Sequence, residues 1–382
     1  MNKEQTRPGR PRPDIAALSA YVPGRSVEEV RRRYGLDDVA RLASNENPVG
    51  PSPRAVAAAT AVLAASNRYP DGASTALRER LATVYRLAPA NVIVGNGSDE
   101  IILLLALAYL RPGETAVMAA PPYAIHRSAV AIAGGAVAGV ALKDHVHDLD
   151  AMADAVGEDT KLVFVANPHN PTGTHLDRDA LRRFAAHIPA RTLLVVDEAY
   201  HDYVDDAARH TARDLLDDYP NVVTLRTFSK AHGLAGLRAG YALAHEDVVG
   251  MLDRIRPPFD LNIAAQAAAL AALDDDAHVR HVARENRAGR ARLIAIARRH
   301  GLTTVPSETN FVLIQVDDSA ALTEALMARG VIVRPGGNLG MPGWIRVSVG
   351  TNDDLDRFER AMELVGSRKP EVTAMSSLFT NR

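Results

Sequence analysis

Lys230 lies in a glycine-rich stretch, TFSKAHGLAGLRAG (227–240), which directly follows the apolar run NVVTLR. A lysine beside a buried strand is costly unless its charge is paired or suppressed. A neutral lysine amine can attack a carbonyl carbon and form an imine. Ser229 and Arg238, in the same stretch, could hold an anion near that amine. The stretch therefore indicates either an exposed loop lysine or a nucleophile beside an anion site.

Polar residues follow three further apolar runs. Ser98 and Asp99 open the apolar helix pattern of GNGSDEIILLLALA, where backbone N–H groups could bind an anion or Ser98 could simply cap the helix. Asn170 lies in NPHNPTG, where the prolines force an extended turn that could direct its amide into a cleft or form a plain turn. Asp197, in LLVVDEAY, would need a cationic partner at the mouth of a buried strand, unless it caps the next helix.

These residues depend on a sheet to bring them together. Short runs rich in Val and Leu, bounded by turn residues, are typical of strands buried on both faces of a parallel sheet. Ligands gather at the carboxyl ends of such strands. The predicted strands lie in NVIVGNG, TAVMAA, KLVFVAN, TLLVVDEAY, NVVTLRTF and AGYALA, and Ala-rich stretches at 54–65, 177–187 and 262–273 are predicted to be helices packed on that sheet.

The domain organisation is predicted from changes in composition. We expect a disordered arm, an N-terminal segment that contributes to a small domain and covers the site, a large domain, a small α+β domain and a loose tail. Their boundaries are 1–13, 14–48, 49–274, 275–366 and 367–382, respectively.

Composition excludes several classes of function. The chain has 382 residues and a formal net charge of -2, which gives no reason to expect nucleic acid as a partner. It has no cysteine, so disulfides and thiolate metal sites are excluded. Its start is basic but has no apolar core of a signal sequence, and the apolar run 101–110 is too short to cross a membrane. We expect a cytoplasmic protein.

Taken in order, the motifs resemble those of the fold-type I, pyridoxal-phosphate-dependent aminotransferases, above all the histidinol-phosphate aminotransferase family. The resemblance spans roughly residues 15–365 and rests on the stretches SNENPVGPSP, NRYPDG, GNGSDEII, NPHNPTG, DEAY, TFSKAHGLAGLRAGY and IRVSVG. It implies an α/β fold with a large domain, whose central sheet is mostly parallel with helices on both faces, and a smaller α+β domain.

The resemblance also implies roles for single residues. Lys230 would carry the cofactor as an imine and move a proton, Asp197 would keep the pyridine nitrogen protonated, and Tyr200 and Asn170 would bond the ring oxygen. Tyr123 would stack on the ring. The phosphate would be held by Ser98, Asp99, Thr227, Ser229 and Arg238, together with Tyr69 from the partner subunit of a homodimer.

The substrate is less closely defined. By the same resemblance Arg346 would receive the carboxylate of the amino donor, Arg334 would join it on a substrate phosphate, and Tyr21 and Asn47 would complete the substrate site. Two arginines suit a phosphorylated amine such as histidinol phosphate, and equally a dicarboxylate such as glutamate or 2-oxoglutarate, the amino acceptor we expect.

Three histidines depart from the family pattern: His126, His169 and His232. Each can be a tolerated polar replacement. Together they leave room for an aromatic amino acid or a specialised biosynthetic intermediate as substrate. His145 and His147, in DHVHD, could share a strand face as metal ligands, but we interpret this segment as a solvated loop and predict no metal site.

Two other protein classes resemble this family. Threonine-phosphate decarboxylases share the lysine, the aspartate and the phosphate-binding residues, and would differ by releasing carbon dioxide. Aminotransferase-like sensor domains of transcription regulators follow a DNA-binding domain. Only about 40 residues precede SNENP here, which is too few for such a domain, and Lys230 is intact.

Overall fold

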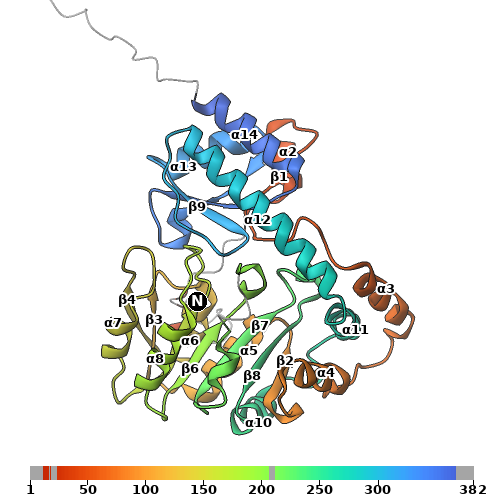
Figure 1. Ribbon diagram of the computed structural model, residues 1–382, viewed down its shortest axis with the longest axis vertical. Coiled ribbons are helices and arrows are strands. Elements are labelled where there is room, and N and C mark those ends of the chain that lie inside the picture. Colours follow the sequence, from red (N-terminus) through yellow and green to blue (C-terminus); the bar gives the residue numbers. More distant parts are fainter. Residues whose placement is uncertain (1–11, 17, 19–23, 206–210, 367–382) are drawn as a thin grey trace, which may run out of the picture.

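The computed structural model describes residues 12–16, 18, 24–205 and 211–366. These residues form a large and a small domain, and the long helix α12 (Asp276–Arg299) runs from one to the other (Figure 1). Tyr21, the tail after 366 and nearly all of the N-terminal arm lie outside the described residues. Among the helices that the structure describes, none is both long and apolar enough to cross a membrane.

The large domain is built on a sheet of seven strands in the order β2-β8-β7-β6-β5-β3-β4. Only β8 runs antiparallel to its neighbours, so the sheet is mostly parallel. All six apolar runs predicted to be strands are strands. Their bounds, with that of β4, are β2 (Val92–Gly95), β3 (Thr115–Ala120), β4 (Ala136–Ala141), β5 (Thr160–Ala166), β6 (Leu193–Asp197), β7 (Val222–Thr227) and β8 (Gly240–Ala244).

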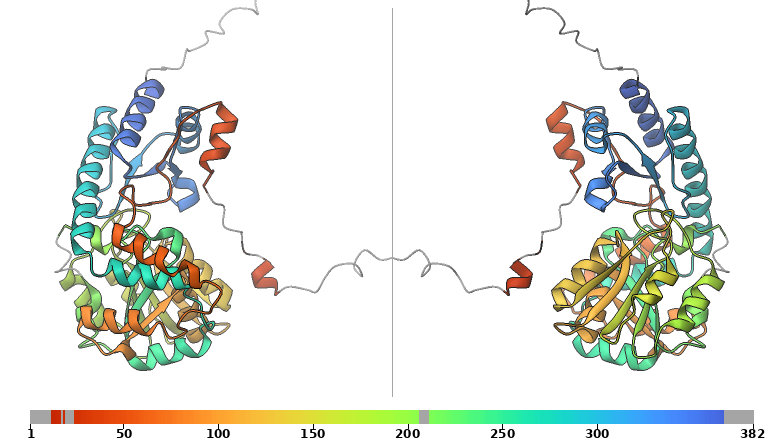
Figure 2. Two further views of the ribbon diagram at one scale, coloured as in Figure 1. Left: turned by 90° about the vertical axis from the view of Figure 1, so that its right-hand side faces the viewer. Right: turned by 90° about the vertical axis from the view of Figure 1, so that its left-hand side faces the viewer.

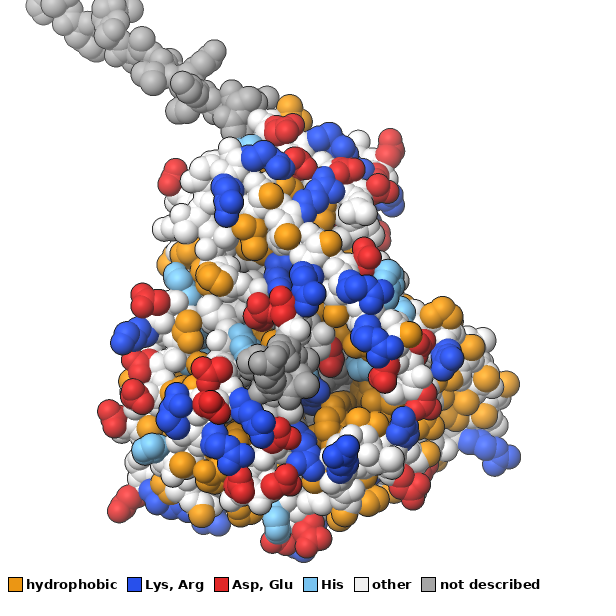
Figure 3. All heavy atoms as spheres, in the orientation of Figure 1, with side chains coloured by type: hydrophobic (Ala, Val, Ile, Leu, Met, Phe, Trp, Pro, Cys, Tyr) orange, Lys and Arg blue, Asp and Glu red, His pale blue; other side chains and the backbone are white. Residues whose placement is uncertain are grey.

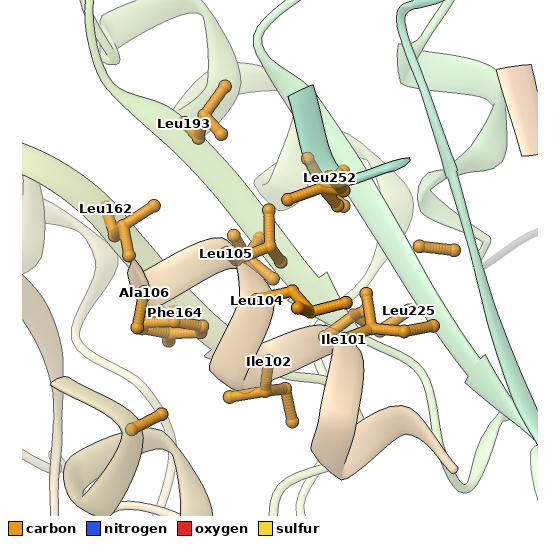
Figure 4. Close-up of a cluster of buried hydrophobic side chains, with 14 of the residues drawn as sticks. Ile101, Ile102, Leu104, Leu105, Ala106, Leu162, Phe164, Leu193, Leu225 and Leu252 are labelled. Carbon is orange, nitrogen blue, oxygen red and sulfur yellow. The ribbon is translucent and has the colours of Figure 1, made fainter. Parts of the chain in front are cut away.

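Helices cover both faces of this sheet because its side chains alternate between two apolar faces. Figure 4 shows one face, where Ile101 and Leu105 of α5 pack near Leu225 of β7 and Leu252 of α10. The opposite face packs on α7 and α8 through side chains such as Val163. The helices of this domain are α3 (Pro53–Val62), α4 (Thr75–Tyr85), α5 (Ser98–Tyr109), α6 (Ala124–Ala133), α7 (Leu149–Asp154), α8 (Arg178–His187), α10 (Glu246–Ile255) and α11 (Ile263–Ala272).

Several of these helices begin where the sequence supplies a capping side chain. Asp177 accepts a hydrogen bond from the backbone N–H of Ala180 at the start of α8, and Asn262 does the same for Ala265 in α11. Such caps satisfy N–H groups that have no partner inside the helix. The Ala-rich stretches predicted to be helices correspond to α3, α8 and α11, with α3 starting one residue earlier than predicted.

The small domain combines the C-terminal part of the chain with residues that precede the large domain. β1 (Ala40–Arg41) pairs in parallel with β10 (Val331–Ile332), while β9, β11 and β12 form an antiparallel sheet. Leu42, Leu293 and Phe358 belong to its core. α2 lies on the side of this domain away from α12 (Figure 2). Its remaining elements are α2 (Val27–Tyr34), β9 (Phe311–Gln315), α13 (Ser319–Met327), β11 (Arg334–Pro335), β12 (Trp344–Ser348) and α14 (Asn352–Gly366), while α1 (Pro13–Ala16) lies outside this domain (Figure 2).

Candidate active site

The sheet brings the predicted residues to one edge. β2, β5, β6 and β7 are mutually parallel, so their carboxyl ends lie at the same edge of the sheet, and β8 begins there. Asp197 is the last residue of β6 and Thr227 is the last residue of β7, while α5 begins at Ser98 just after β2. This edge is where ligands bind in parallel-sheet proteins.

An anion cradle is formed where α5 starts beside β8. Gly97 has φ +84°, and a Cβ built on it would lie 2.6 Å from Nη2 of Arg238. A Cβ on Gly240 would lie 2.3 Å from the backbone nitrogen of Ser98. Gly97 therefore admits the Arg238 guanidinium, and Gly240 admits the backbone at Ser98, at distances that a side chain would block. The N–H groups at the start of a 12-residue helix could therefore bind an anion, with an arginine beside them.

Hydroxyl groups and Arg238 complete the cradle. Arg238 Nη1 donates to Ser229 Oγ at 3.3 Å, and Nη2 donates to Asp99 Oδ2 at 3.2 Å. Thr227 Oγ1 accepts from the backbone N–H of Ser229 at 3.1 Å. The Asp99 carboxylate also accepts from the hydroxyl of Tyr123 at 3.1 Å. These five predicted residues thus lie in one hydrogen-bonded group together with the helix start.

Asp197 is buried and has two donors. Oδ2 lies 3.0 Å from Nε2 of His126, and Oδ1 accepts from the backbone N–H of Ala199 at 3.1 Å. His126 is itself buried; its ring stacks on Phe164 and meets Tyr123 edge to face. This histidine, which by sequence could be a tolerated replacement, is the side-chain partner of Asp197. Its spacing of three residues from Tyr123, on one side of α6, was the signal that could have revealed it.

Two further histidines lie behind His126. The rings of His147 and His169 meet edge to face with their centres 4.6 Å apart, and both lie close to His126. Burial lowers the pKa of His147 to about 4, and burial also lowers the pKa of His169 well below its usual value. The expectation of a solvated loop was therefore wrong for His147, which is buried and bonds the carbonyl of Ala166 through Nε2. The described residues include no group of three or more potential ligands that could hold a metal ion.

Lys230 lies beside a hydrogen-bonded group around Tyr200. Its Nζ donates to the carbonyl of Asn45 at 3.2 Å and lies 5.5 Å from the centre of the Tyr200 ring. The Tyr200 hydroxyl accepts from Nδ2 of Asn45 at 2.9 Å and from Nδ2 of Asn170 at 3.4 Å. Asn45 also accepts from the hydroxyl of Ser348 in the small domain, at 2.8 Å. Asn45 was not predicted from the sequence. Its backbone has a φ of 55°, a conformation in which asparagine is enriched, but this angle is known only from the structure.

The two predicted substrate arginines are neighbours on adjacent strands. Arg334 of β11 and Arg346 of β12 are partners in the antiparallel register, so their side chains leave the same face of the sheet. Both are buried. Arg346 Nη1 donates to Oδ1 of Asn170 at 2.6 Å, across the junction of the two domains. One carboxamide therefore links this arginine to the Tyr200 hydroxyl.

Three other predicted residues lie apart from this group. Tyr69 is 81% exposed and stacks on Phe259 at 4.6 Å. The amide of Asn47 donates to the carbonyls of Gly50 and Ala231, so its contact with a substrate stays a prediction. His232 packs against Phe228, and burial lowers its pKa.

The chain matches known proteins of one family over most of its length. The model of the aminotransferase class I and II family matches residues 37–362. A histidinol-phosphate aminotransferase of Cupriavidus pinatubonensis is 45% identical over 355 residues, which cover 91% of this chain and 94% of the relative. A histidinol-phosphate aminotransferase of Pseudomonas aeruginosa is 44% identical, with 92% and 96% covered.

Solved structures agree. The histidinol-phosphate aminotransferase of Sinorhizobium meliloti, solved with pyridoxal-5'-phosphate, has a TM-score of 0.86 at 32% identity and covers 95% of this chain and 99% of its own. An aspartate aminotransferase mutant of Thermus thermophilus has a TM-score of 0.80 at 25% identity, with 92% and 100% covered. The chain belongs to the class I and II aminotransferases, with their α/β fold of a large and a small domain.

Proposed function

We propose that this chain is a histidinol-phosphate aminotransferase that uses pyridoxal 5'-phosphate and passes the amino group to 2-oxoglutarate. The observation that carries the proposal is the convergence of Lys230, Asp197 and the Arg238 cradle at one sheet edge. Its support is the identity of 45% to a curated histidinol-phosphate aminotransferase over nearly the whole chain. We further propose that it works as a homodimer in the cytoplasm.

The residues at the sheet edge fit the cofactor. Arg238 at Gly97 and the Ser98 backbone at Gly240 leave no room for a side chain on either glycine, which suits a phosphate seated on the start of α5. Buried Asp197 offers a carboxylate to a ring N–H, and Tyr123, just before α6, donates to Asp99 at the cradle. The Tyr200 hydroxyl already accepts two hydrogen bonds, so its own proton is available to donate to a ring oxygen.

When bound, the cofactor supplies an electron-withdrawing ring that stores the amino group between the two halves of the reaction. Lys230 provides the amine that attaches the cofactor and, once displaced by the amino donor, takes up and returns a proton at Nζ. The Asn45 carbonyl, 3.2 Å away, holds that amine. Asn45 is in turn fixed by Ser348 of the small domain, so both domains position the lysine.

Two neighbouring arginines favour a substrate with strong negative charge. Arg346 and Arg334 present their guanidinium groups from one face of a two-strand pair, a geometry suited to a phosphate or a carboxylate. We assign the phosphate of histidinol phosphate, and in the second half-reaction a carboxylate of 2-oxoglutarate, to this pair.

The homodimer would bring Tyr69 to the phosphate of the partner's site. Tyr69 and Phe259 are both exposed and stacked on each other, which suits residues that a second subunit covers. Hydrophobic side chains also gather on the right of Figure 3, where α3 and the turn after it expose Val56 and Leu63.

The test is a half-reaction screen on cofactor-loaded protein. The cofactor absorbance is followed as histidinol phosphate, glutamate, phenylalanine, tyrosine and histidine are added in turn. We expect rapid conversion by histidinol phosphate and by glutamate, and none in Lys230→Ala. Conversion by phenylalanine or tyrosine with histidinol phosphate inert would move the substrate to the aromatic amino acids, and release of carbon dioxide would show a decarboxylase.

A further inference from the structure

Each main-chain and side-chain polar group of Asn45 forms a hydrogen bond. Its Nδ2 donates to the Tyr200 hydroxyl at 2.9 Å, and its Oδ1 accepts from the Ser348 hydroxyl at 2.8 Å. Its backbone N–H donates to Ser348 Oγ at 2.9 Å, while its carbonyl accepts from Lys230 Nζ and from Nδ2 of Asn310. Asn45 is buried, so these bonds form away from bulk water. It therefore joins the small domain to both Lys230 and Tyr200.

Ser348 sets the orientation of the Asn45 carboxamide. Its oxygen accepts from the backbone N–H of Asn45, and its own proton donates to Oδ1. If the carboxamide were turned round, Nδ2 would face Ser348, and the hydroxyl proton would have no acceptor among the described residues. Because Ser348 is buried, an unsatisfied hydroxyl there would be costly. The serine thus keeps Nδ2, a donor, directed at Tyr200.

The carboxamide of Asn170 has the same orientation towards Tyr200. Arg346 donates to its Oδ1, and because a guanidinium can only donate, Nδ2 must be the end that faces the Tyr200 hydroxyl. Arg346 and Ser348 are two residues apart on β12, so their side chains leave the same face of the strand. One strand of the small domain therefore orients both carboxamides that contact Tyr200.

The two carboxamides determine what the Tyr200 hydroxyl can do. Its oxygen accepts from two N–H groups, so its single proton is left for an acceptor elsewhere. In the proposed function that acceptor is the ring oxygen of the cofactor. An acceptor at the position of Asn45 Nδ2 would instead bind this proton and draw it away from the ring.

We propose that Asn45 is a positioning residue: held by Ser348, its amide N–H directs the Tyr200 hydroxyl to donate to the cofactor's ring oxygen. The inference rests on the contact proposed above between Tyr200 and that oxygen. It adds a residue that acts through Tyr200, and it makes the direction of the Tyr200 proton depend on the small domain.

The test exchanges the N–H donor of Asn45 for an acceptor of the same shape. Asn45→Asp keeps the size of the side chain, and aspartate also adopts the φ of 55° found here. The new carboxylate would accept the Tyr200 proton through one oxygen. Ser348 would still donate to the other oxygen, which favours the charged form of the carboxylate.

The readout is the absorbance of the lysine-bound cofactor, followed against pH in the holoenzyme. The nitrogen that joins Lys230 to the cofactor carries a proton at low pH, and it holds this proton more tightly when the ring oxygen is more negative. A donor on the ring oxygen offsets that charge, so it lowers the midpoint of the titration. We therefore expect Tyr200→Phe and Asn45→Asp each to raise the midpoint by about one pH unit.

Double variants separate the redirected proton from the added charge. In Tyr200→Phe no hydroxyl proton remains, so Asn45→Asp should raise the midpoint there only through its charge, and by less than it does with Tyr200 present. Asn45→Gly keeps the φ, adds no charge and offers no acceptor. It should raise the midpoint less than Asn45→Asp with Tyr200 present, and should not change it in Tyr200→Phe.

The outcomes distinguish this inference from the proposed function. Suppose Tyr200→Phe raises the midpoint, but Asn45→Asp does not or raises it equally in both backgrounds. Then Asn45 does not act through Tyr200, and the proposed function stands without this inference. If Tyr200→Phe leaves the midpoint unchanged, the contact of Tyr200 with the ring oxygen is wrong, and this inference is overturned with it.

Discussion

At the scale of single residues, the active site depends on hydrogen-bond partners for its buried charged groups. Asp197 would be an isolated buried carboxylate without His126, because only a backbone N–H remains on its other oxygen. The imidazole also fills the space between Tyr123 and Phe164. His126 therefore has two separable functions, as a hydrogen-bond partner and as a packed ring.

Replacing His126 by phenylalanine keeps an aromatic ring but removes the partner of Asp197. We expect the cofactor-free protein to lose about 1–3 kcal/mol in the free energy of unfolding, the cost of a buried acceptor left without its donor. The loss should be smaller in the cofactor-loaded protein, where the ring N–H of the cofactor offers Asp197 another donor. Urea unfolding of both forms measures this difference.

His126→Gln is the matched control, since its amide can still donate to Asp197. Equal destabilisation of the loaded and cofactor-free forms by phenylalanine would show that the ring only packs.

At the scale of elements, the buried carboxylate of Glu198 links the ends of strands β6 and β7 to the segment at Thr211 and Ala212. Glu198 accepts from Thr211 Oγ1 at 3.0 Å and from the backbone N–H of Ala212, and its carboxylate lies 3.6 Å from Nη1 of Arg226. Burial nevertheless raises the pKa of Glu198 to about 7, although Arg226 and the two donors oppose the rise. The residue that directly follows Asp197 at the end of β6 is thus a second buried carboxylate, and this one titrates near neutral pH.

This pKa predicts how stability changes with pH. Between about pH 4.5 and about 7 the folded chain holds a proton on Glu198 that the unfolded chain releases, so this residue's contribution to stability falls as the pH rises. The total change is about 3 kcal/mol. Glu198→Gln removes it and keeps both an acceptor and a donor.

Urea unfolding at several pH values from about 5 to about 8 checks the sign. The stability of the wild type minus that of Glu198→Gln should decrease with rising pH and level off above about pH 7. A difference that does not depend on pH would contradict the raised pKa. His147, whose depressed pKa has the opposite effect, is present in both proteins and cancels.

The strands and the anion cradle could be predicted from the sequence because both depend on local patterns. Apolar runs indicate buried strands wherever they occur, and the glycines of GNGS and LRAG lie next to the residues that they serve. The partners of Tyr200 and Asp197 could not, because they come from distant segments. Asn45 meets Tyr200 across 155 residues, and His126 meets Asp197 across 71, so only the packed sheet makes these pairs visible.

At the scale of the whole molecule, the proposed homodimer makes each site depend on two chains. Lys230 lies within the chain's own site, whereas Tyr69 is exposed and would act in the partner's. Variants of these two residues therefore damage different halves of one shared site.

Mixing Lys230→Ala with Tyr69→Phe tests this dependence. In a mixed dimer, one site would combine an intact Lys230 with an intact Tyr69. After unfolding and refolding the mixture together, we expect about a quarter of the wild-type sites to recover, because half of the dimers are mixed and each has one whole site. Activity equal to the average of the two refolded single variants would contradict a Tyr69 that crosses between subunits.

In the hydrogen bond from Arg346 to Asn170, the amide oxygen competes with the substrate for the arginine. One N–H on Nη1 of the guanidinium donates to a neutral carboxamide, so a ligand that takes this N–H must displace the amide. A neutral ligand exchanges one ordinary hydrogen bond for another and gains little, whereas a phosphate or carboxylate replaces it with a charge-assisted pair. The displaced amide still donates a hydrogen bond to the Tyr200 hydroxyl, so binding of the anion would change the hydrogen bonding at the cofactor's ring oxygen. The site would thus select anionic ligands by exchange of this hydrogen bond, and uncharged analogues would bind weakly without any steric barrier.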